Sequence, residues 1–343
     1  MKHLLNTLYV TTQGSYLTRD GATVLVHLDQ EEKVRLPVHT LGSIVCFGQV
    51  SCSPWLMALC AENNVAMSFF TERGQFLARV QGAVRGNVLL RREQYRRADD
   101  PKGTSAIVRS LVLAKVANCR TVVMRAARER SPDPELNALQ AAAVQLAALL
   151  TSVEATSAVD SIRGLEGESA RVYFSVFDHL ITASKDSFFF RERNRRPPMD
   201  NVNALLSFLY TLLVHDVEAA LEGVGLDPCV GFLHTDRPGR PSLALDLMEE
   251  FRPFLADRLA LSLINRRQVN GAGFKATESG AVTMDDETRK TVLVAWQQRK
   301  QEEIQHPFLG EGIALGLLPH VQALLLARHL RGDLDAYPAF FWR

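Results

Sequence analysis

Apolar side chains follow two different periods along this chain, and the change near residue 80 restricts the fold more than any other feature. Before that point, short segments rich in Val, Ile, Tyr and Thr are separated by turn signals such as Gln13-Gly14. Their close spacing predicts antiparallel neighbours. Beyond it, long windows carry helical periodicity. We therefore expect an α+β chain: a small N-terminal antiparallel β-rich domain at 1–83, and a larger all-α domain at 84–343.

The individual elements follow from the same periods. Strands are expected at Thr7–Val10, Ser15–Thr18, Thr23–Leu28, Val34–Val38, Ser43–Phe47, Val65–Phe70 and Phe76–Val80. Ser53 is a suitable cap for a helix that begins with Pro54 and runs to about Glu62. Further helices are expected over Thr104–Glu129, Pro134–Ser152, Val159–Leu180, Asp200–Glu222, Leu243–Asn265, Met284–Gln305 and Gly316–Leu330.

Composition excludes several classes of protein. With 343 residues, 47% of them hydrophobic and 22% charged, the chain lacks the bias of disordered, collagenous or coiled-coil sequences. No uncharged apolar run looks long enough for a membrane span, and the five cysteines form no CxxC pair, so we expect a cytoplasmic protein with reduced, mostly buried thiols. The 39 basic and 38 acidic residues nearly cancel, but net charge does not exclude a basic patch for nucleic acid.

A first candidate site begins at Arg163-Gly164-Leu165-Glu166-Gly167. On a helix, Glu166, Ala170 and Tyr173 share one face, which presents a carboxylate, a small residue and an aromatic ring. Taken alone, a glutamate here is more often a solvated surface residue.

A second candidate combines His234, which ends an apolar stretch, with two acids on the following helix. Asp246 and Glu249 are three residues apart, so they share a face and can converge on one cation. Carboxylates with one imidazole suit Mn²⁺ or Mg²⁺, and the lack of clustered cysteines argues against structural zinc. A lone histidine is more often a core residue. Asp178-His179 and His215-Asp216 lie within helical segments and are interpreted as structural.

Arginines form two dense clusters, at 85–97 and at 191–196. Such clusters suit phosphate contacts, although a solvated helix face or ion pairs at a domain junction would also explain each one. The helix that follows Pro197-Pro198 also offers amide groups at its N-terminus for an anion. The aromatic tail at 337–343 is expected to pack against its own core rather than against a partner.

Three blocks in this order resemble a known family. They are the Glu166 block with Ala170 and Tyr173; Arg195-Arg196-Pro197-Pro198-Met199-Asp200 with the helix that follows; and Gly231-Phe232-Leu233-His234 with Asp246-Leu247-Met248-Glu249-Glu250-Phe251-Arg252. The chain closely resembles the CRISPR-associated integrase of spacer acquisition over essentially its whole length. The amino-acid sequences of these blocks are most similar to the branch found beside type I-C-like systems.

The resemblance implies a divalent-metal-dependent DNA endonuclease and integrase, which hydrolyses and transesterifies phosphodiesters with Mn²⁺ or Mg²⁺. It implies Glu166, His234 and Glu249 as metal ligands, Asp246 as a further catalytic acid, and Tyr173 as a residue supporting the site. Some relatives carry Asp at the last position, so the division of labour between Asp246 and Glu249 stays open. Expected DNA contacts come from Arg85, Arg91, Arg92, Arg191, Arg193, Arg195, Arg196 and Arg252.

The same resemblance implies partners. They are double-stranded DNA, as prespacer and CRISPR repeat, a second copy of the chain in a homodimer, and a small Cas adaptation protein that bridges two dimers. Two alternatives remain open at this point: a metal-dependent nuclease that trims DNA or resolves branches, and a non-catalytic scaffold that grips DNA through its arginines.

Overall fold

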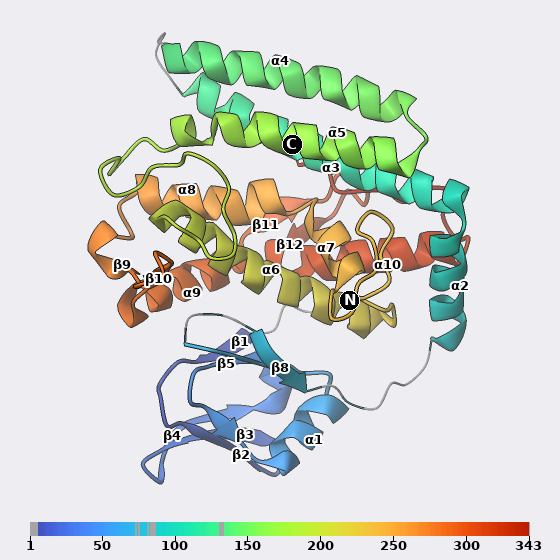
Figure 1. Cartoon of the computed structure of the whole chain (residues 1–343). Coiled ribbons are helices and arrows are strands. Elements are labelled where there is room, and N and C mark those ends of the chain that lie inside the picture. The colour runs from blue at the N-terminus through green and yellow to red at the C-terminus, as the bar shows by residue number, and fades with distance from the viewer. Residues whose placement is uncertain are drawn as a thin grey trace. The chain divides into compact units, whose positions relative to one another are not determined.

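The structure is a computed structural model, and it describes residues 6–72, 74, 76–80, 82, 87–129 and 134–342. The chain divides into two compact units (Figure 1). The first comprises Met1–Gly86 with Leu293–Gln301, and the second comprises Asn87–Val292 with Glu302–Arg343. The expected boundary between residues 83 and 84 lies outside the described residues, and so does Arg85.

The described part of the first unit holds two sheets of four strands, helix α1 and the last part of helix α9 (Asp286–Gln301). One sheet has the strand order β1-β5-β7-β8 and the other the order β4-β3-β2-β6. The elements are β1 (Asn6–Val10), β2 (Tyr16–Asp20), β3 (Thr23–Leu28), β4 (Glu31–Pro37), β5 (Leu41–Phe47), β6 (Ser51–Cys52), α1 (Pro54–Glu62), β7 (Ala66–Phe70) and β8 (Phe76–Val80). The expected β-rich start is therefore present, and the expected strands lie within a few residues of the observed ones.

The expectation of antiparallel neighbours is wrong for part of both sheets. Strands β2, β3 and β4 do pair antiparallel, as do β7 and β8. However, β5 pairs in parallel with both β1 and β7, and β2 pairs in parallel with β6. Parallel strands need a crossover connection. The chain supplies one, because β2 to β4 lie between β1 and β5, while β6 and α1 lie between β5 and β7.

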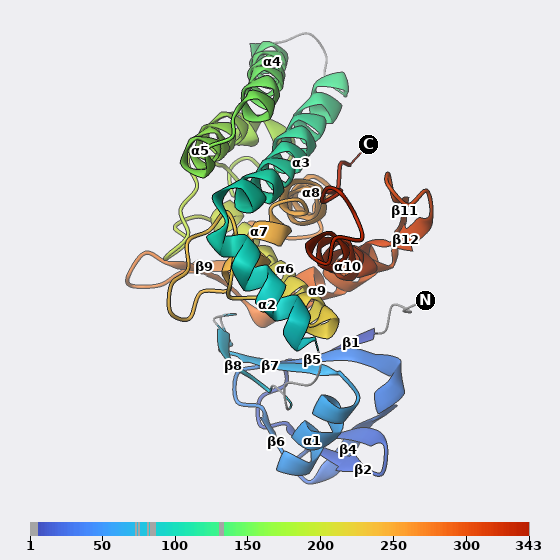
Figure 2. The same ribbon diagram turned by 90° about the vertical axis from the view of Figure 1, so that its right-hand side faces the viewer.

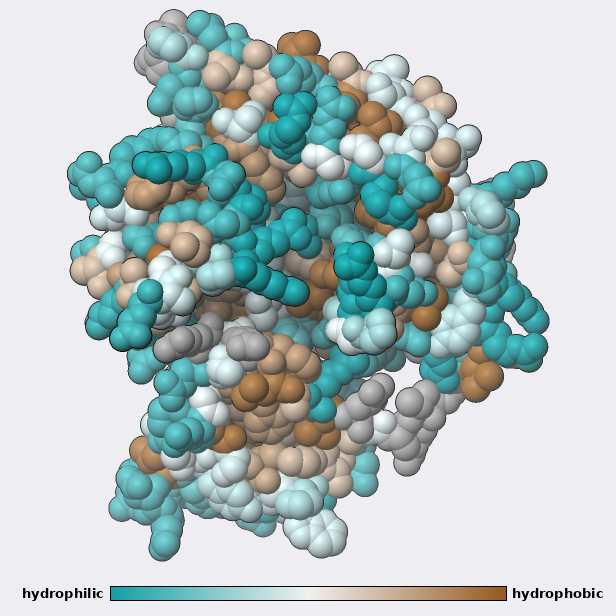
Figure 3. Space-filling view, in the orientation of Figure 1, coloured by the Kyte–Doolittle hydropathy of each residue, from teal (hydrophilic) through white to brown (hydrophobic). Residues whose placement is uncertain are grey.

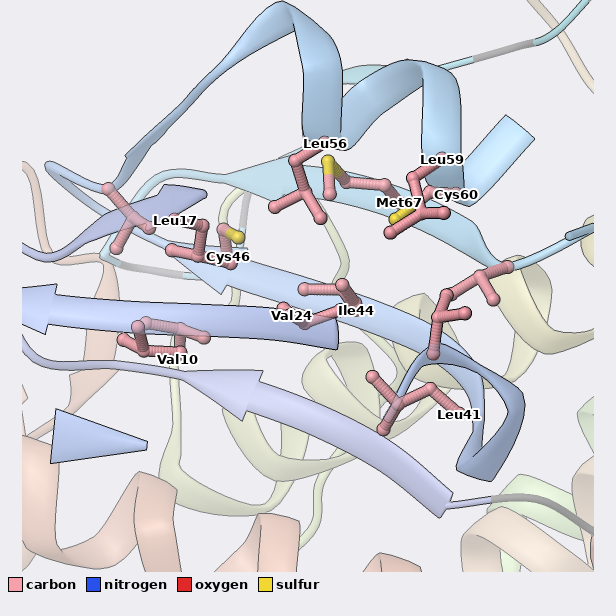
Figure 4. Packing of buried hydrophobic residues seen from close by; sticks show 14 residues of the cluster. Val10, Leu17, Val24, Leu41, Ile44, Cys46, Leu56, Leu59, Cys60 and Met67 are labelled. Carbon is pink, nitrogen blue, oxygen red and sulfur yellow. The ribbon is translucent and has the colours of Figure 1, made fainter. Parts of the chain in front are cut away.

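The core of the first unit lies between its sheets and helix α1. Leu17, Ile44 and Leu56 are fully buried there, and Met67 packs with them (Figure 4). Helix α1 begins as expected, because the Ser53 side chain accepts a hydrogen bond from the Leu56 amide at 3.2 Å and Pro54 follows. The five cysteines are free, as expected, and burial raises the pKa of the buried thiols; for Cys46 and Cys60 it is about 12.

The second unit is predominantly helical. Its helical elements are α2 (Val88–Asp99), α3 (Pro101–Arg128), α4 (Pro134–Ala155), α5 (Val159–Ser175), η2 (Phe177–Leu180), α6 (Asn201–Val224), α7 (Ser242–Met248), η3 (Arg252–Asp257), α8 (Arg258–Asn265), η4 (Gly271–Gly273), α9 (Asp286–Gln301), η5 (Leu315–Leu317) and α10 (Leu318–Leu330). Helices α3, α4 and α5 lie side by side (Figures 1 and 2). Helix α6 packs against α7, α8 and α10.

Three sequence-based boundaries differ from the structure. The helix expected over Leu243–Asn265 is interrupted, because α7 ends at Met248 and the π-helical segment η3 precedes α8. The helix expected to reach Gln305 ends at Gln301, where a hairpin of β11 (Glu303–Gln305) and β12 (Gly312–Ala314) begins. A second hairpin, of β9 (Phe274–Ala276) and β10 (Val282–Met284), and helix α2 have no counterpart among the expected elements. Strands this short give little period-2 signal.

The tail packs against its own unit, as the sequence predicts. Tyr337, Phe340 and Trp342 are buried. The Asn118 side chain donates hydrogen bonds to the carbonyl oxygens of Glu250 and Phe340, and accepts one from the Trp342 amide. These bonds tie the tail to helix α3 and to the segment after α7.

Two helices are long and apolar enough to cross a membrane by length and composition, against the expectation that no apolar run is long enough. Such a test does not separate a span from a core helix. In α6, 61% of the most apolar window is buried inside this structure, and in α4 the share is 28%. Helix α4 packs against α3 and α5 through buried side chains such as Leu139 and Leu146. The absence of a membrane segment and the cytoplasmic location stay predictions.

Candidate functional site

Glu166 lies in the middle of α5, and Arg163 fixes this helix to the segment that carries the candidate histidine. The guanidinium group of Arg163 donates two hydrogen bonds, of 3.0 Å from Nε and 2.9 Å from Nη2, to the carbonyl oxygen of Leu233. Arg163 lies one helical turn before Glu166, and Leu233 directly precedes His234. The contact between Arg163 and Leu233 therefore fixes the position of the Glu166 carboxylate relative to His234.

His234 is held by the buried carboxylate of Asp246. Its Nδ1 lies 2.6 Å from Oδ1 of Asp246, which also accepts the His234 amide at 2.9 Å. The other oxygen, Oδ2, accepts the amides of Phe232 at 2.6 Å and Leu233 at 2.9 Å. A carboxylate can only accept, so Nδ1 donates to Asp246 and the ring turns Nε2 away from that carboxylate.

Gly231 allows this arrangement. A Cβ atom at this position would lie 2.8 Å from Cβ of Ser242 and 2.9 Å from Oδ2 of Asp246, closer than Cβ contacts occur. Only glycine lets α7 approach the segment before His234 so closely. The Gly-Phe-Leu-His block and Asp246 therefore form one structural unit that orients the imidazole ring.

Glu249 caps the C-terminal end of α7 and faces a different group from Asp246. Its side chain is 2% exposed, Oε1 lies 2.6 Å from Nη1 of Arg252, and Oε2 lies 2.7 Å from Nζ of Lys115. The pair with Lys115 is poorly aligned, so Oε2 makes no well-formed hydrogen bond in the described structure. Asp246 and Glu249 thus share a helix face in sequence, but the first carboxylate orients His234 and the second faces two cations.

Lys115, on α3, joins the two glutamates. Its Nζ contacts Oε1 of Glu166 as well as Oε2 of Glu249, and its side chain is only 8% exposed. Burial by itself would lower the pKa of Lys115, but the two carboxylates, Glu249 more than Glu166, hold it above the usual value. The lysine is therefore a charged ammonium group inside the site.

Charges around Glu249 keep it ionised. Burial alone would raise its pKa, but the positive charge of Arg252, followed by that of Lys115, lowers it to about 2. Lys115 thus joins Glu166 of α5 to Glu249 at the end of α7, and Arg163 ties α5 to the carbonyl oxygen of the residue before His234.

The donors at this site fit a divalent ion. A histidine whose Nδ1 is held by a carboxylate and whose Nε2 is free is the usual metal-binding arrangement, and Oε2 of Glu249 is a buried oxygen without an aligned donor. Carboxylate oxygens and one imidazole suit Mn²⁺ or Mg²⁺. Among the described residues, no three acidic, histidine or cysteine side chains form a ready metal cluster. The ammonium group of Lys115 lies between the two glutamates.

Known proteins share this sequence and fold. A family model described as CRISPR associated protein Cas1 matches residues 8–298. The chain belongs to the Cas1 family. It is 55% identical to the CRISPR-associated endonuclease Cas1 1 of Chlorobaculum tepidum and 54% identical to the CRISPR-associated endonuclease Cas1 2 of Rhodospirillum rubrum, over all of each chain.

A solved structure agrees with the family assignment. The Cas1 protein from Thermotoga maritima superposes with a TM-score of 0.81 at 25% identity, and the match covers 96% of this chain and 97% of that one. The β-rich start followed by a helical unit is therefore the Cas1 fold. The assignment to a type I-C-like branch stays a prediction.

A buried aromatic layer lies behind the site of this Cas1 chain. Asp257, at the end of η3, accepts hydrogen bonds from the hydroxyls of Tyr173 at 3.1 Å and Tyr210 at 2.6 Å. Burial raises the pKa of Asp257 to about 6 against the effect of those bonds. The guanidinium groups of Arg252 and Arg193 lie 5.0 and 5.2 Å from the Tyr210 ring centre. The hydroxyl of Tyr173 is therefore bound to Asp257, and a role of Tyr173 in supporting the site stays a prediction.

The predicted DNA-binding arginines differ in their surroundings. Arg193 is half-buried with neutral partners, Asn203 at 2.6 Å and Ser207 at 3.1 Å, and burial lowers its pKa. Arg252 is half-buried against Glu249. The others are mostly exposed: Arg92 on α2, and Arg191, Arg195 and Arg196 before α6; Arg91 is half-buried. Hydrophilic side chains cover much of the face of the second unit seen in Figure 3.

A cavity of about 410 Å³ opens beside His234. Tyr95 and Asp99 of α2 line one side, and Arg163 and Asp236 line others. Gln94, fully buried on α2, donates to the carbonyl oxygens of Asp227 and Val230 and so fixes the segment that leads to His234. The cavity gives a substrate access to the imidazole from the side of α2.

Lys115 is the site residue that sequence reasoning missed. Its signal was present, because Lys115 falls on the apolar stripe of α3 with Val108, Leu111, Val112 and Cys119. A lysine on a core-facing stripe needs a buried acidic partner. No local pattern shows which acid that is, because Glu166 is 51 residues further along the chain.

Proposed function

We propose that this chain is a divalent-metal-dependent DNA integrase and endonuclease of CRISPR adaptation. In the reaction, the 3′-hydroxyl oxygen of incoming DNA forms a bond to a repeat phosphorus, and the bond from that phosphorus to the 3′ oxygen of the repeat strand breaks. One phosphodiester is lost and one is formed. With water in place of the hydroxyl, the same site cleaves DNA.

The observation that carries this proposal is the set of contacts that ties the segments of Glu166, His234 and Glu249 together: Lys115 joins the two glutamates, and Arg163 ties α5 to the carbonyl oxygen before His234. Each of the three residues comes from a separate segment, and each matches a ligand implied by the family resemblance. A bound Mn²⁺ or Mg²⁺ would supply charge to stabilise the phosphoryl oxygens. The names of the two bacterial relatives, both endonucleases, support the same chemistry.

The chain's own residues bind and orient the substrate. Asp246 keeps the His234 ring in place through Nδ1, while Arg163 holds α5 in register with it. Arg193 is a half-buried cation among neutral partners, so it has charge available for a phosphate. The exposed Arg195 and Arg196 add phosphate contacts at the start of α6.

Helical glycines leave room for DNA beside Glu166. At Gly164 and Gly167, no described atom other than those of the adjacent residues and of the helix's own backbone lies within 4 Å of where a Cβ would be. Glycine within a helix lowers stability by about 1 kcal/mol relative to alanine, so these two residues are not explained by packing within the chain. Close approach of a DNA backbone to α5 would explain them.

The partners follow as part of the same proposal: double-stranded DNA as prespacer and repeat, a second copy of the chain, and a small Cas adaptation protein that bridges two dimers. The cell's choice between Mn²⁺ and Mg²⁺ is a separate question, and cytoplasmic action accords with a DNA substrate.

A joining assay tests this function. Wild-type protein with the small partner, a duplex with free 3′-hydroxyls and a repeat-containing DNA should yield branched half-site products, and Glu166→Ala should yield none. Fragments without joined products would identify a plain nuclease. Salt-sensitive DNA binding that a chelator leaves unchanged, with no products at all, would identify a scaffold. Full joining by Glu166→Ala would show that the site is elsewhere.

A further inference from the structure

We propose that Lys115 is a built-in cation of the metal site, which neutralises Glu166 and Glu249 while no divalent ion is bound and which the ion displaces on binding. The inference rests on the proposed function, because it concerns the same two carboxylates. It assigns a role to a residue outside the expected ligand set.

The geometry supports a shared position for the two cations. Nζ of Lys115 contacts Glu166 on α5 and Glu249 after α7, so one ammonium group bridges two different elements. The carboxylate oxygens that it contacts are those a divalent ion would need. Because the lysine side chain is almost fully buried, few other positions within the site satisfy its charge.

The charge balance points the same way. Lys115 and Arg252 together match Glu166 and Glu249, so this cluster of four side chains is neutral as it stands. A divalent ion added beside both cations would leave an excess of positive charge in a buried place, where like charges repel strongly. Lysine is suited to give way, since its ammonium group is carried on a flexible stem, whereas the planar fork of Arg252 is fixed on Glu249.

The contacts make metal binding a competition. Without metal, the ammonium group of Lys115 stabilises the folded protein. The divalent ion binds more weakly than it would to the two carboxylates alone, because it must first displace Lys115. Removing the charge of Lys115 should therefore destabilise the metal-free protein and strengthen metal binding at once. A residue that only packs the core would not produce that pair of effects.

The experiment uses the full chain with Lys115→Met, which keeps the length of the side chain and removes its charge. Thermal unfolding is followed in chelator and over a Mn²⁺ titration, and the Kd for Mn²⁺ is measured from the electron paramagnetic resonance signal of the free ion. We expect a lower Tm in chelator, a larger rise of Tm with Mn²⁺ than in wild type, and Mn²⁺ binding at least about tenfold tighter.

Two control variants separate charge from side-chain loss. Lys115→Arg keeps the cation and should bind Mn²⁺ no more tightly than wild type. Lys185→Met removes a lysine outside this cluster, whose Nζ lies 2.7 Å from a carboxylate oxygen of Asp178. This variant should leave the Kd for Mn²⁺ unchanged. Unchanged or weaker Mn²⁺ binding by Lys115→Met would overturn the proposal.

Failure of Lys115→Met to fold in chelator is covered by a second variant. The double variant Lys115→Met with Glu166→Gln removes one charge of each sign, so its Tm in chelator should recover towards wild type. No recovery would also overturn the proposal.

The two proposals can fail separately. If wild type binds Mn²⁺ and Glu166→Gln abolishes this binding, but Lys115→Met binds no tighter, only the role of Lys115 is wrong. If Glu166→Gln leaves Mn²⁺ binding unchanged, the metal site itself, and with it the proposed function, is wrong.

Discussion

Replacing Asp246 by asparagine tests whether this carboxylate orients the site or binds metal. The side chain is fully buried, and its two oxygens accept four hydrogen bonds: two from the His234 amide and ring, and two from the amides of Phe232 and Leu233. Asparagine has the same shape but only one acceptor oxygen. An NH₂ group that faces Phe232 and Leu233 opposes two buried amide donors, whereas one that faces His234 opposes only its amide, because the imidazole can shift its proton and accept through Nδ1.

The expected loss follows from those contacts. Hydrogen bonds to a charged acceptor contribute about 1.5–3 kcal/mol each, so the loss of one or two of them should lower the free energy of unfolding by about 1.5–6 kcal/mol. This is a large fraction of the ~5–15 kcal/mol that stabilises a typical domain. The loss should already appear in chelator, because these contacts do not involve a metal, and it should be larger in Mn²⁺, because His234 is no longer oriented for the ion.

Urea unfolding of Asp246→Asn and wild type, in chelator and in Mn²⁺, measures the difference. The matched control is Asp100→Asn, since Asp100 also accepts two backbone amides, those of Lys102 and Gly103, but as the cap of α3. Asparagine caps helices about as well as aspartate, so this change should be within about 0.5 kcal/mol. The reasoning is refuted if Asp246→Asn unfolds like wild type in chelator and loses only the stabilisation by Mn²⁺.

Three further predictions concern α5, the arginines and pH. Gly167→Ala should raise the free energy of unfolding by about 0.5–1 kcal/mol but weaken DNA binding. The control Gly223→Ala, at an equally open position of α6, should raise the free energy of unfolding and leave DNA binding unchanged. Equal DNA affinities of the two variants in gel-shift assays would contradict a close approach of DNA to α5. Charge reversal at Arg195 and Arg196 should lower duplex affinity and reduce the salt slope by about 2, and an unchanged slope would make them structural. Burial raises the pKa of Glu250 from 4.5 to about 7, so the folded state holds this proton more tightly than the unfolded state does. The free energy of unfolding should therefore fall by up to about 3 kcal/mol between pH ~4.5 and ~7. Urea titrations across this pH range should show a smaller fall for Glu250→Gln.

Local signals explain where the sequence predicted well. Ser53 and Pro54 begin α1 because a side-chain cap and a proline need only neighbouring residues. The strands of the first unit were found for the same reason, since alternation is visible within five residues. Strand direction was not predicted, because the parallel pairing of β1 with β5 depends on the crossover formed by the intervening strands β2 to β4.

The sequence by itself determined the expected ligand set through the resemblance of three ordered blocks to the Cas1 family, which implies Glu166, His234 and Glu249. Residue types and spacing alone suggested only that His234, Asp246 and Glu249 could meet at one cation. Only the tertiary structure decided what each acid faces. Asp246 and Glu249 share a helix face, yet one orients His234 and the other meets Lys115, because their partners come from segments far away in the sequence. A buried charge is assigned its role by the charge packed against it, and that pairing exists only once α3, α5 and α7 have come together.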